Sequence, residues 1–304
     1  MPTVDQLRGH GEQIIISCGH WQACIDTHGA QVLGLFYKRK NLLYYNQSDI
    51  GHSGVPICLP NFGPLDQGVF KCSEGLYSIG QHGFVRDSSF ELVFRAADKV
   101  SYQLCSSTVS RKMFPFDFCF TVTFTLGEQG LMCDYQFVNL CENKIPLAPG
   151  IHPYFAVSEG AKINLATKAR YANDNKLNYA VIALEDRLNV LSIASDGTVQ
   201  YEVSGSPDLH LIDHGLRDTQ LTIGDDTAIV ITADLDSFNR MTLWRRAEDS
   251  GFVCLEPAYV KNGLNDDPLM IASNSAWNSS LGIGHPVYLI GLYMFGSVRE
   301  NDDS

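Results

Sequence analysis

The stretch Phe118-Cys119-Phe120-Thr121-Val122-Thr123-Phe124-Thr125-Leu126 alternates large apolar residues with small or polar ones. A period of two over this length is the pattern of a β-strand with one buried face. After the turn-like residues Gly127-Glu128-Gln129-Gly130, the same alternation resumes over residues 131–137. The sequence therefore predicts a long β-hairpin here, and this hairpin sets the expected fold class.

Shorter stretches of strand character lie on both sides of the hairpin, most of them separated by short turns. They cover residues 13–18, 29–45 with a turn at 37–41, 89–95, 100–105, 198–203, 209–212, 219–223, 228–235, 240–244, 251–256 and 285–295. Only residues 179–188 are expected to contain a turn or two of helix. Many short strands predict an all-β protein, a sandwich or a barrel. Without a linker or repeat, we expect one domain over residues 1–304, with its core between about 13 and 295.

The composition excludes several classes of function. The net charge is -12 and the sequence pI is about 5.1, whereas a nucleic-acid-binding surface needs concentrated positive charge. The N-terminus lacks a basic start followed by an apolar stretch, so no signal peptide is expected. The longest apolar run, Val287 to Phe295, is far shorter than the roughly 20 residues of a membrane helix. We expect a cytoplasmic protein that binds neither nucleic acid nor membrane; the oligomeric state stays open.

The nine cysteines form no CxxC pair and are odd in number. Neither a zinc site nor a complete disulfide framework is therefore indicated. Several cysteines lie within apolar strand patterns, where a free thiol behaves as a small hydrophobic side chain. We expect reduced thiols throughout, and no metal.

The long segment from Asn46 to Gln81 is rich in Gly, Pro, Asp and Ser. It is too long for an ordinary connection inside a compact domain, and long ordered loops usually carry function. Whether it forms a fixed wall or a moving lid is left open.

Two residues are the strongest candidates for acid–base chemistry. His152 lies in Pro149-Gly150-Ile151-His152-Pro153-Tyr154-Phe155, and Glu256 ends the apolar strand 252–255 before Pro257. Histidine is the side chain that most often exchanges protons near neutral pH, and a carboxylate at a strand end can serve as a general base. The structural alternatives are a packed histidine and a solvated strand-end acid.

Three further residues are candidates for binding. His82 and Arg86 lie four residues apart in Gln81-His82-Gly83-Phe84-Val85-Arg86, and Asp213 follows the strand 209–212. Arginine presents a planar set of donors suited to carboxylate, phosphate or paired hydroxyl groups. A solvated turn is the alternative for each of them.

Other catalytic templates are absent from the sequence, which contains no Walker A loop, GxGxxG, GxSxG or HExxH motif. Ser53 beside His52 and Cys18 near His20 are the only nucleophile candidates, and both are weak.

Taken together, the motifs resemble the aldose 1-epimerase (mutarotase) superfamily, nearest its glucose-6-phosphate 1-epimerase branch. The resemblance covers about residues 13–295, in family order. The matching pieces are Gly29-Ala30-Gln31-Val32, Gly54-Val55-Pro56-Ile57-Cys58, Pro60-Asn61-Phe62-Gly63, 81–86, Phe114-Pro115-Phe116, Asn139, 150–155, Ile212-Asp213 and Val253-Cys254-Leu255-Glu256-Pro257.

The resemblance implies a large antiparallel β-sandwich of the galactose mutarotase type that interconverts the α and β anomers of an aldose without a cofactor. By motif position, Glu256 is the expected general base, His152 the acid that protonates the ring oxygen, and His82 an assisting group. Arg86 and Asp213 are expected to bind the sugar. Aromatic residues near these motifs, including Phe62 and Tyr154, are candidate platforms for its C–H face.

Two departures from the family concern the substrate. His52 stands where the phosphosugar branch typically has an arginine that binds phosphate, and Ala258-Tyr259 replaces a common tryptophan after Glu-Pro. The sequence therefore favours a neutral aldose or an unusual hexose derivative over a hexose 6-phosphate. A non-catalytic sugar-binding protein and a lyase or hydrolase on a related sandwich remain alternatives.

Overall fold

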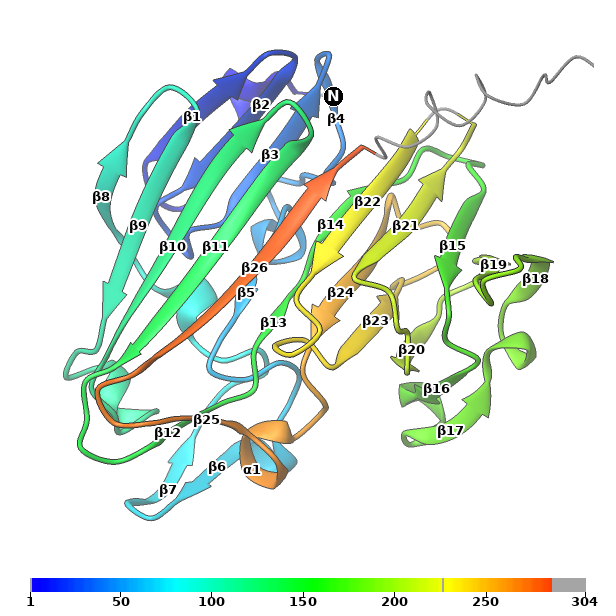
Figure 1. Cartoon of the computed structure of the whole chain (residues 1–304). Coiled ribbons are helices and arrows are strands. Elements are labelled where there is room, and N and C mark those ends of the chain that lie inside the picture. The colour runs from blue at the N-terminus through cyan, green and yellow to red at the C-terminus, as the bar shows by residue number, and fades with distance from the viewer. Residues whose placement is uncertain (1, 226, 286–304) are drawn as a thin grey trace, which may run out of the picture.

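The chain is described by a computed structural model that covers residues 2–225 and 227–285. Two large antiparallel sheets dominate it, which confirms the predicted all-β sandwich. In Figure 1 the ten-stranded sheet runs from β8 at the left to β18 at the right, and β24 and β23 of the second sheet lie behind it. In sheet order, the ten strands are β18 (Asn189–Ile193), β19 (Val199–Glu202), β15 (Ile163–Thr167), β21 (Asp218–Ile223), β22 (Thr227–Ala233), β26 (Ala276–Gly284), β11 (Gly130–Asn139), β10 (Phe118–Gly127), β9 (Lys99–Cys105) and β8 (Glu91–Arg95).

The second sheet carries several of the candidate site residues. Its strands, in order, are β17 (Ala180–Ala183), β16 (Tyr171–Asp174), β20 (Asp208–Ile212), β23 (Arg240–Trp244), β24 (Phe252–Ala258), β13 (Gly150–Ile151) and β5 (Ile57–Cys58), with β14 (Tyr154–Ala156) also paired to β24.

Smaller elements complete the fold. A four-stranded sheet contains β1 (Gln13–Cys18), β2 (Trp21–Asp26), β3 (Val32–Tyr37) and β4 (Lys40–Asn41), and two short sheets pair β12 (Ile145–Leu147) with β25 (Leu269–Ile271) and β6 (Val69–Cys72) with β7 (Gly75–Ser78). The helices are short: α1 (Gly263–Asp266) and the 3₁₀ turns η1 (Val4–Gln6), η2 (Ile50–His52), η3 (Asp66–Gly68), η4 (Val85–Asp87), η5 (Ser110–Lys112), η6 (Asn175–Leu177) and η7 (Leu184–Asp186).

The predicted hairpin is confirmed as β10 and β11, in continuous register from the pair Phe118 and Asn139 to the pair Gly127 and Gly130. Its inward-facing residues are buried and its alternate residues are more exposed, as the period of two requires. The aromatic rings of Phe118 and Phe137 stack with their centroids 4.8 Å apart. This hairpin anchors the core that both large sheets share.

Strands β20, β23 and β24 use the same alternation in a different way. Leu209, Leu243 and Leu255 face the main core and are fully buried. The residues next to each leucine along its own strand point to the opposite face of the sheet, because successive side chains of a strand alternate. Glu256 is therefore placed on the outer face of its strand, away from the ten-stranded sheet.

Some elements differ from the sequence-based expectation. Several strands were not predicted, among them β2, β15, β16, β18 and β26; β26 is rich in small and polar residues, and its apolar periodicity is weak. The segment 46–81 is not a continuous loop, because it contains η2, β5, η3 and the β6–β7 hairpin. Residues 179–188 contain η7 but also strand β17. The strand expected at 285–295 lies outside the described residues except for His285.

The expectation that all nine cysteines are reduced is wrong for one pair. Cys105 and Cys119 form a disulfide between the neighbouring strands β9 and β10, where the two residues are direct cross-strand partners with Cα atoms 4.1 Å apart. The sequence spacing of 14 gave no sign of this pairing, which depends on the sheet register. The other seven cysteines are free thiols.

None of the helices in the described part of the chain is long and apolar enough to cross a membrane.

Gly83 fixes the position of the loop that carries His82. Its φ is +72°, and a Cβ atom at this position would lie 1.9 Å from the carbonyl oxygen of Leu59. Leu59 and Gly83 form an isolated parallel bridge, so the clash is with backbone that cannot move freely. Only glycine satisfies both the left-handed conformation and the close approach.

Gly83→Ala should therefore destabilise the protein by about 3 kcal/mol, since the left-handed conformation alone costs about 1–2 kcal/mol and the clash adds to it. Gly160→Ala is the matched control, because Gly160 has the same φ of +72° but no atom within 4 Å of the added Cβ. Urea unfolding should give a loss for Gly160→Ala of only about 1–2 kcal/mol. Equal losses in the two variants would contradict the role assigned to the Leu59 contact.

Candidate functional site

A pocket of about 490 Å³ opens on the outer face of the second large sheet. Its lining comes from segments far apart in the sequence: the η2 loop, the loops before η3 and η4, the segment between β13 and β14, and the strands β20, β23 and β24. It brings together the residues predicted as catalytic or sugar-binding, except Asp213, and the nucleophile candidates Ser53 and Cys18 do not line it. The residues that line it are Asp49, Gly51, His52, Phe62, Gly63, Pro64, Gln81, His82, Arg86, Asp87, His152, Tyr154, Asn175, Asp208, His210, Thr242, Trp244, Glu256 and Lys261.

Glu256 lies at the bottom of this pocket, with only 2% of its surface exposed. It is paired across the sheet with Thr242 of β23. Burial raises the pKa of its carboxyl well above the ordinary value, because water is replaced by a medium that disfavours charge. Within the described structure its Oε1 atom has no hydrogen-bond partner. A strong base with an unused acceptor atom therefore faces the pocket.

His152 lies beside it, held by the chain between β13 and β14. Its backbone N–H donates to the carbonyl of Pro56 at 3.0 Å, and its ring stacks on Tyr154 with centroids 4.5 Å apart and planes 9° apart. The ring atom Nε2 lies 3.5 Å from Oε1 of Glu256. Burial lowers the pKa of His152 well below its usual value.

The two shifts act together on the protons of the pair. Burial disfavours charge on both side chains. The pKa of the Glu256 carboxyl therefore rises and that of the His152 imidazole falls, so both groups favour their neutral forms. A pair that shares one exchangeable proton is net neutral whether that proton sits on the carboxyl or on the imidazole. This arrangement is suited to accepting a proton at one atom and giving one at the other.

His82 contributes a second imidazole from the loop before η4. Its ring centroid lies 5.3 Å from that of His152, and the N–H of Gly63 donates to its Nδ1 at 3.2 Å. Its Nε2 lies 3.1 Å from the side-chain amide nitrogen of Gln81. Burial, with a smaller effect of Arg86, lowers the pKa of His82 to about 3. The ring is therefore neutral and contacted on both nitrogens, and it is held on a backbone with a left-handed φ of 67°.

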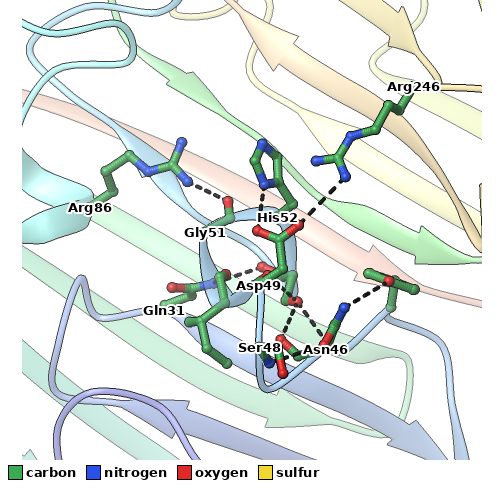
Figure 2. A network of polar contacts seen from close by, with 11 residues as sticks. Gln31, Asn46, Ser48, Asp49, Gly51, His52, Arg86 and Arg246 are labelled. Atoms are coloured by element: carbon green, nitrogen blue, oxygen red, sulfur yellow. Dashed lines mark hydrogen bonds and ion pairs between the residues drawn. The ribbon is translucent and has the colours of Figure 1, made fainter.

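Charged groups at the pocket rim form a connected network (Figure 2). Nδ1 of His52 lies 2.7 Å from Oδ1 of Asp49, and Nη1 of Arg246 lies 3.5 Å from the other oxygen of the same carboxylate. The hydrogen bond from His52 holds the pKa of Asp49 below its usual value. Nη2 of Arg86 donates to the carbonyl of Gly51. His52 and both arginines at this end of the pocket thus already contact protein acceptors.

The opposite wall consists of residues that the sequence analysis did not single out. Nδ1 of His210 lies 2.9 Å from Oγ1 of Thr242, and Asn175 donates to Asp208 at 2.9 Å. Trp244 lies next to Thr242 on the same face and meets His152 edge-on at 5.7 Å between ring centroids. The available signal was the polar or aromatic residue at alternate positions of an otherwise apolar strand.

Asp213 must be corrected as a candidate binding residue, since the structure places it outside the pocket. It follows the last residue of β20 in an exposed turn with a left-handed φ of 50°. Asp208 begins the same strand and lines the pocket instead. The two ends of a five-residue strand are about 13 Å apart, so only one of them reaches the pocket.

Phe62 and Tyr154 both lie in the pocket lining, as expected for apolar platforms. Phe62 meets His82 edge-on, with centroids 5.1 Å apart, and Gly150 leaves the space that its ring occupies, since a Cβ there would lie 2.3 Å from a ring carbon. Tyr154 lies beneath His152 and is almost fully buried. One ring is therefore a wall of the pocket and the other mainly a support for the imidazole.

Known proteins resemble both the sequence and the fold. Solved structures that resemble the fold include the Slr1438 protein of Synechocystis sp. PCC 6803, with a TM-score of 0.79 at 20% identity, covering 91% of this chain and 97% of that one. A galactose mutarotase-like protein of Lactobacillus casei gives a TM-score of 0.73 at 20% identity and covers 90% and 99% of the two chains. The chain thus has the fold of the galactose mutarotase-like β-sandwich proteins.

The sequence comparisons point to one family within this fold. Residues 44–181 match the family model described as aldose 1-epimerase. A relative from Salmonella typhimurium, named "Putative glucose-6-phosphate 1-epimerase", is 30% identical over 117 residues. That match covers 37% of this chain and spans only 35% of the relative's length. The resemblance to the aldose 1-epimerase superfamily inferred from the motifs is confirmed.

The buried carboxyl of Glu256 has a consequence for stability. Its pKa is raised in the folded state, so the stability it contributes is complete below the unfolded pKa and is lost as the pH rises through the folded pKa. A glutamine does not ionise. Glu256→Gln should therefore raise the thermal midpoint near neutral pH by the equivalent of about 1 kcal/mol, with a gain that grows from pH 5 to pH 8.

Asp49→Asn is the control of opposite sign, because the pKa of Asp49 is lowered and its contribution is present above the unfolded pKa. Replacing it should lower the thermal midpoint at neutral pH and have less effect at low pH. Calorimetric melting curves at several pH values measure both. A Glu256→Gln gain that shrinks as the pH rises would contradict the raised pKa.

Proposed function

We propose that this protein is an aldose 1-epimerase that interconverts the two anomers of an aldose by acid–base ring opening. The observation that carries the proposal is the 3.5 Å separation between Oε1 of Glu256 and Nε2 of His152 at the bottom of the pocket. The anomeric hydroxyl and the ring oxygen of a sugar are both bonded to C1. A base and an acid that act on these two oxygens must therefore lie close together.

In the proposed reaction the pair reacts with its shared proton on the His152 imidazole, and the carboxylate of Glu256 takes the proton of the anomeric hydroxyl. The electrons of that O–H bond form the aldehyde C=O, the bond between C1 and the ring oxygen breaks, and His152 gives its proton to the ring oxygen. Rotation about the C1–C2 bond presents the other face of the aldehyde, and the reverse transfers close the ring. Each positioned proton transfer is worth about 10²- to 10⁴-fold in rate.

Other lining residues support this chemistry. The neutral imidazole of His82, whose ring centroid lies 5.3 Å from that of His152, is suited to hydrogen-bonding the ring oxygen or a neighbouring hydroxyl. Asp208, His210 and Thr242 supply hydrogen-bonding groups on the far wall, where the hydroxyls of a sugar need partners. Phe62 and Trp244 provide apolar surface for its C–H bonds.

The rim network favours an uncharged aldose over a hexose 6-phosphate. The carboxylate of Asp49 contacts both His52 and Arg246 and compensates the charge of Arg246. Asp87 and Asp208 also line the pocket, where the lysine and arginine side chains are Arg86 and Lys261. A phosphate dianion would meet this acidic rim, and Arg86 already donates to a backbone carbonyl.

A hexose-6-phosphate 1-epimerase is the second candidate function. It is favoured by the guanidinium of Arg86 in the pocket lining and by the name of the Salmonella relative. Both candidate functions use the same ring-opening reaction, and they differ in whether the pocket rim has to bind a phosphate group.

Magnetization-exchange NMR between anomeric protons tests the reaction on D-glucose, D-galactose and glucose 6-phosphate. The wild-type protein should accelerate exchange of at least one sugar, and Glu256→Gln and His152→Ala should each reduce this acceleration by about 10²-fold or more. Asp213→Ala, outside the pocket, should retain the wild-type rate. Full activity in either pocket variant refutes the assignment. Sugar binding without acceleration identifies a carbohydrate-binding protein instead.

A comparison of free and phosphorylated sugars tests the rim. Wild-type protein should bind glucose 6-phosphate no more tightly than the free sugar; a tenfold preference for the phosphosugar, about 1.4 kcal/mol, would contradict this. Asp49→Asn removes the negative charge beside His52 and Arg246 and should improve binding of the phosphosugar relative to the free sugar. The side chain is nearly isosteric, and the Asp49 carbonyl that accepts from Ser53 at 3.0 Å is unaltered.

A further inference from the structure

Three potential metal ligands converge at the bottom of the pocket. The imidazole of His152, the thiol of Cys254 and the carboxylate of Glu256 bring their ligand atoms within 4.8 Å of one another. Cys254 and Glu256 are two residues apart on β24, so their side chains lie on the same face of the strand. His152 approaches from the neighbouring segment, next to Tyr154, which pairs with Cys254 across the sheet. In the described part of the chain, no other three His, Cys, Asp or Glu side chains make such a group.

The ligand types and the distance between His152 and Glu256 fit a particular class of cation, and the Cys254 sulfur lies within 4.8 Å of both. Ligands at about 2.0–2.3 Å from a tetrahedral Zn²⁺ are separated from one another by roughly 3.3–3.8 Å. The 3.5 Å between Nε2 of His152 and Oε1 of Glu256 falls within this interval. A thiolate and an imidazole favour zinc-like, borderline-soft ions, whereas Mg²⁺ and Ca²⁺ favour oxygen ligands alone.

A second observation points to a ligand at this place. Oε1 of Glu256, the carboxylate atom that lies 3.5 Å from Nε2 of His152, is buried without a hydrogen-bond partner. The exposed fraction of the residue is 2% for Glu256, 6% for His152 and 0% for Cys254. Buried polar atoms are normally paired, and an unpaired one lowers stability unless something else satisfies it. The apolar surroundings, with Tyr154, Trp244 and Phe252 packed around Cys254, also keep competing water out.

We propose that His152, Cys254 and Glu256 form a binding site for a zinc-like divalent cation, with the fourth coordination position open to the pocket. The thiol of Cys254 releases one proton to solvent when its sulfur binds the metal, and no atom changes oxidation state. Because the ion occupies both members of the acid–base pair, it excludes the sugar and inhibits epimerisation. The inhibition rests on the proposed function, whereas the metal binding does not.

Isothermal titration calorimetry with ZnCl₂ on the full chain under reducing conditions tests the site directly. One ion should bind per protein, and MgCl₂ should give no heat of binding. Cys254→Ala should weaken zinc binding by at least about tenfold, since even outer-shell changes at metal sites have effects of this size. The matched control is Cys133→Ala, which removes an equally buried thiol from β11 in the other large sheet and should bind zinc as the wild type does. Equal affinities of the wild type and Cys254→Ala would overturn the proposal.

X-ray absorption at the zinc edge of the wild-type complex gives an answer that does not depend on a variant folding correctly. The spectrum should show one sulfur at about 2.3 Å together with nitrogen or oxygen ligands. A shell of nitrogen and oxygen alone, or of several sulfurs, would exclude this site.

Competition separates this inference from the proposed function. If the protein is an epimerase, ZnCl₂ should inhibit anomer exchange, added sugar should weaken zinc binding, and EDTA should restore the rate. If the wild type does not accelerate exchange with any sugar, the epimerase proposal fails while calorimetry still decides the metal site. If exchange is catalysed but zinc neither binds nor inhibits, the metal proposal alone fails.

Discussion

The alternation of side chains along three neighbouring strands is the constraint on which the rest of this structure depends. On β20, β23 and β24, every second residue enters the core between the two large sheets, and the residues between them form the base of the pocket. A shift of one residue in any of these strands would exchange the two sets and place Leu255 in the pocket and Glu256 in the core. The same apolar burial that stabilises the sandwich therefore also fixes the register of the functional groups.

Much of the fold followed from this periodicity, and what did not follow has physical reasons. The β10–β11 hairpin was predictable because its two faces differ sharply in polarity. Strand β26 lies between β22 and β11 but contains serine, asparagine and glycine, so only its sheet partners define it. The Cys105–Cys119 disulfide likewise depends on a register that is set by the sheet and not by sequence spacing.

The site was predictable where a chemical group stands out from its local pattern. His152, Glu256, His82 and Arg86 were found from motifs that resemble a known family, and the structure brings them to one pocket. Asp213 was chosen because it ends a strand, but the strand direction brings its other end, Asp208, to the pocket. Asp49 escaped notice because its significance lies in its contacts with His52 and Arg246, which are distant from each other in the sequence. Such charge compensation is a property of the assembled rim.

The backbone of His82 bears on how this protein can be engineered. A histidine with a φ of 67° is less stable there than a glycine would be, and a buried carboxyl such as Glu256 also lowers stability. Selection of variants by heat resistance alone would favour replacement of these residues, and the most heat-stable variants of a library would tend to lose these two candidate site residues. A screen for robust variants therefore has to hold these two positions constant and look for improvement in the ten-stranded sheet, far from the pocket.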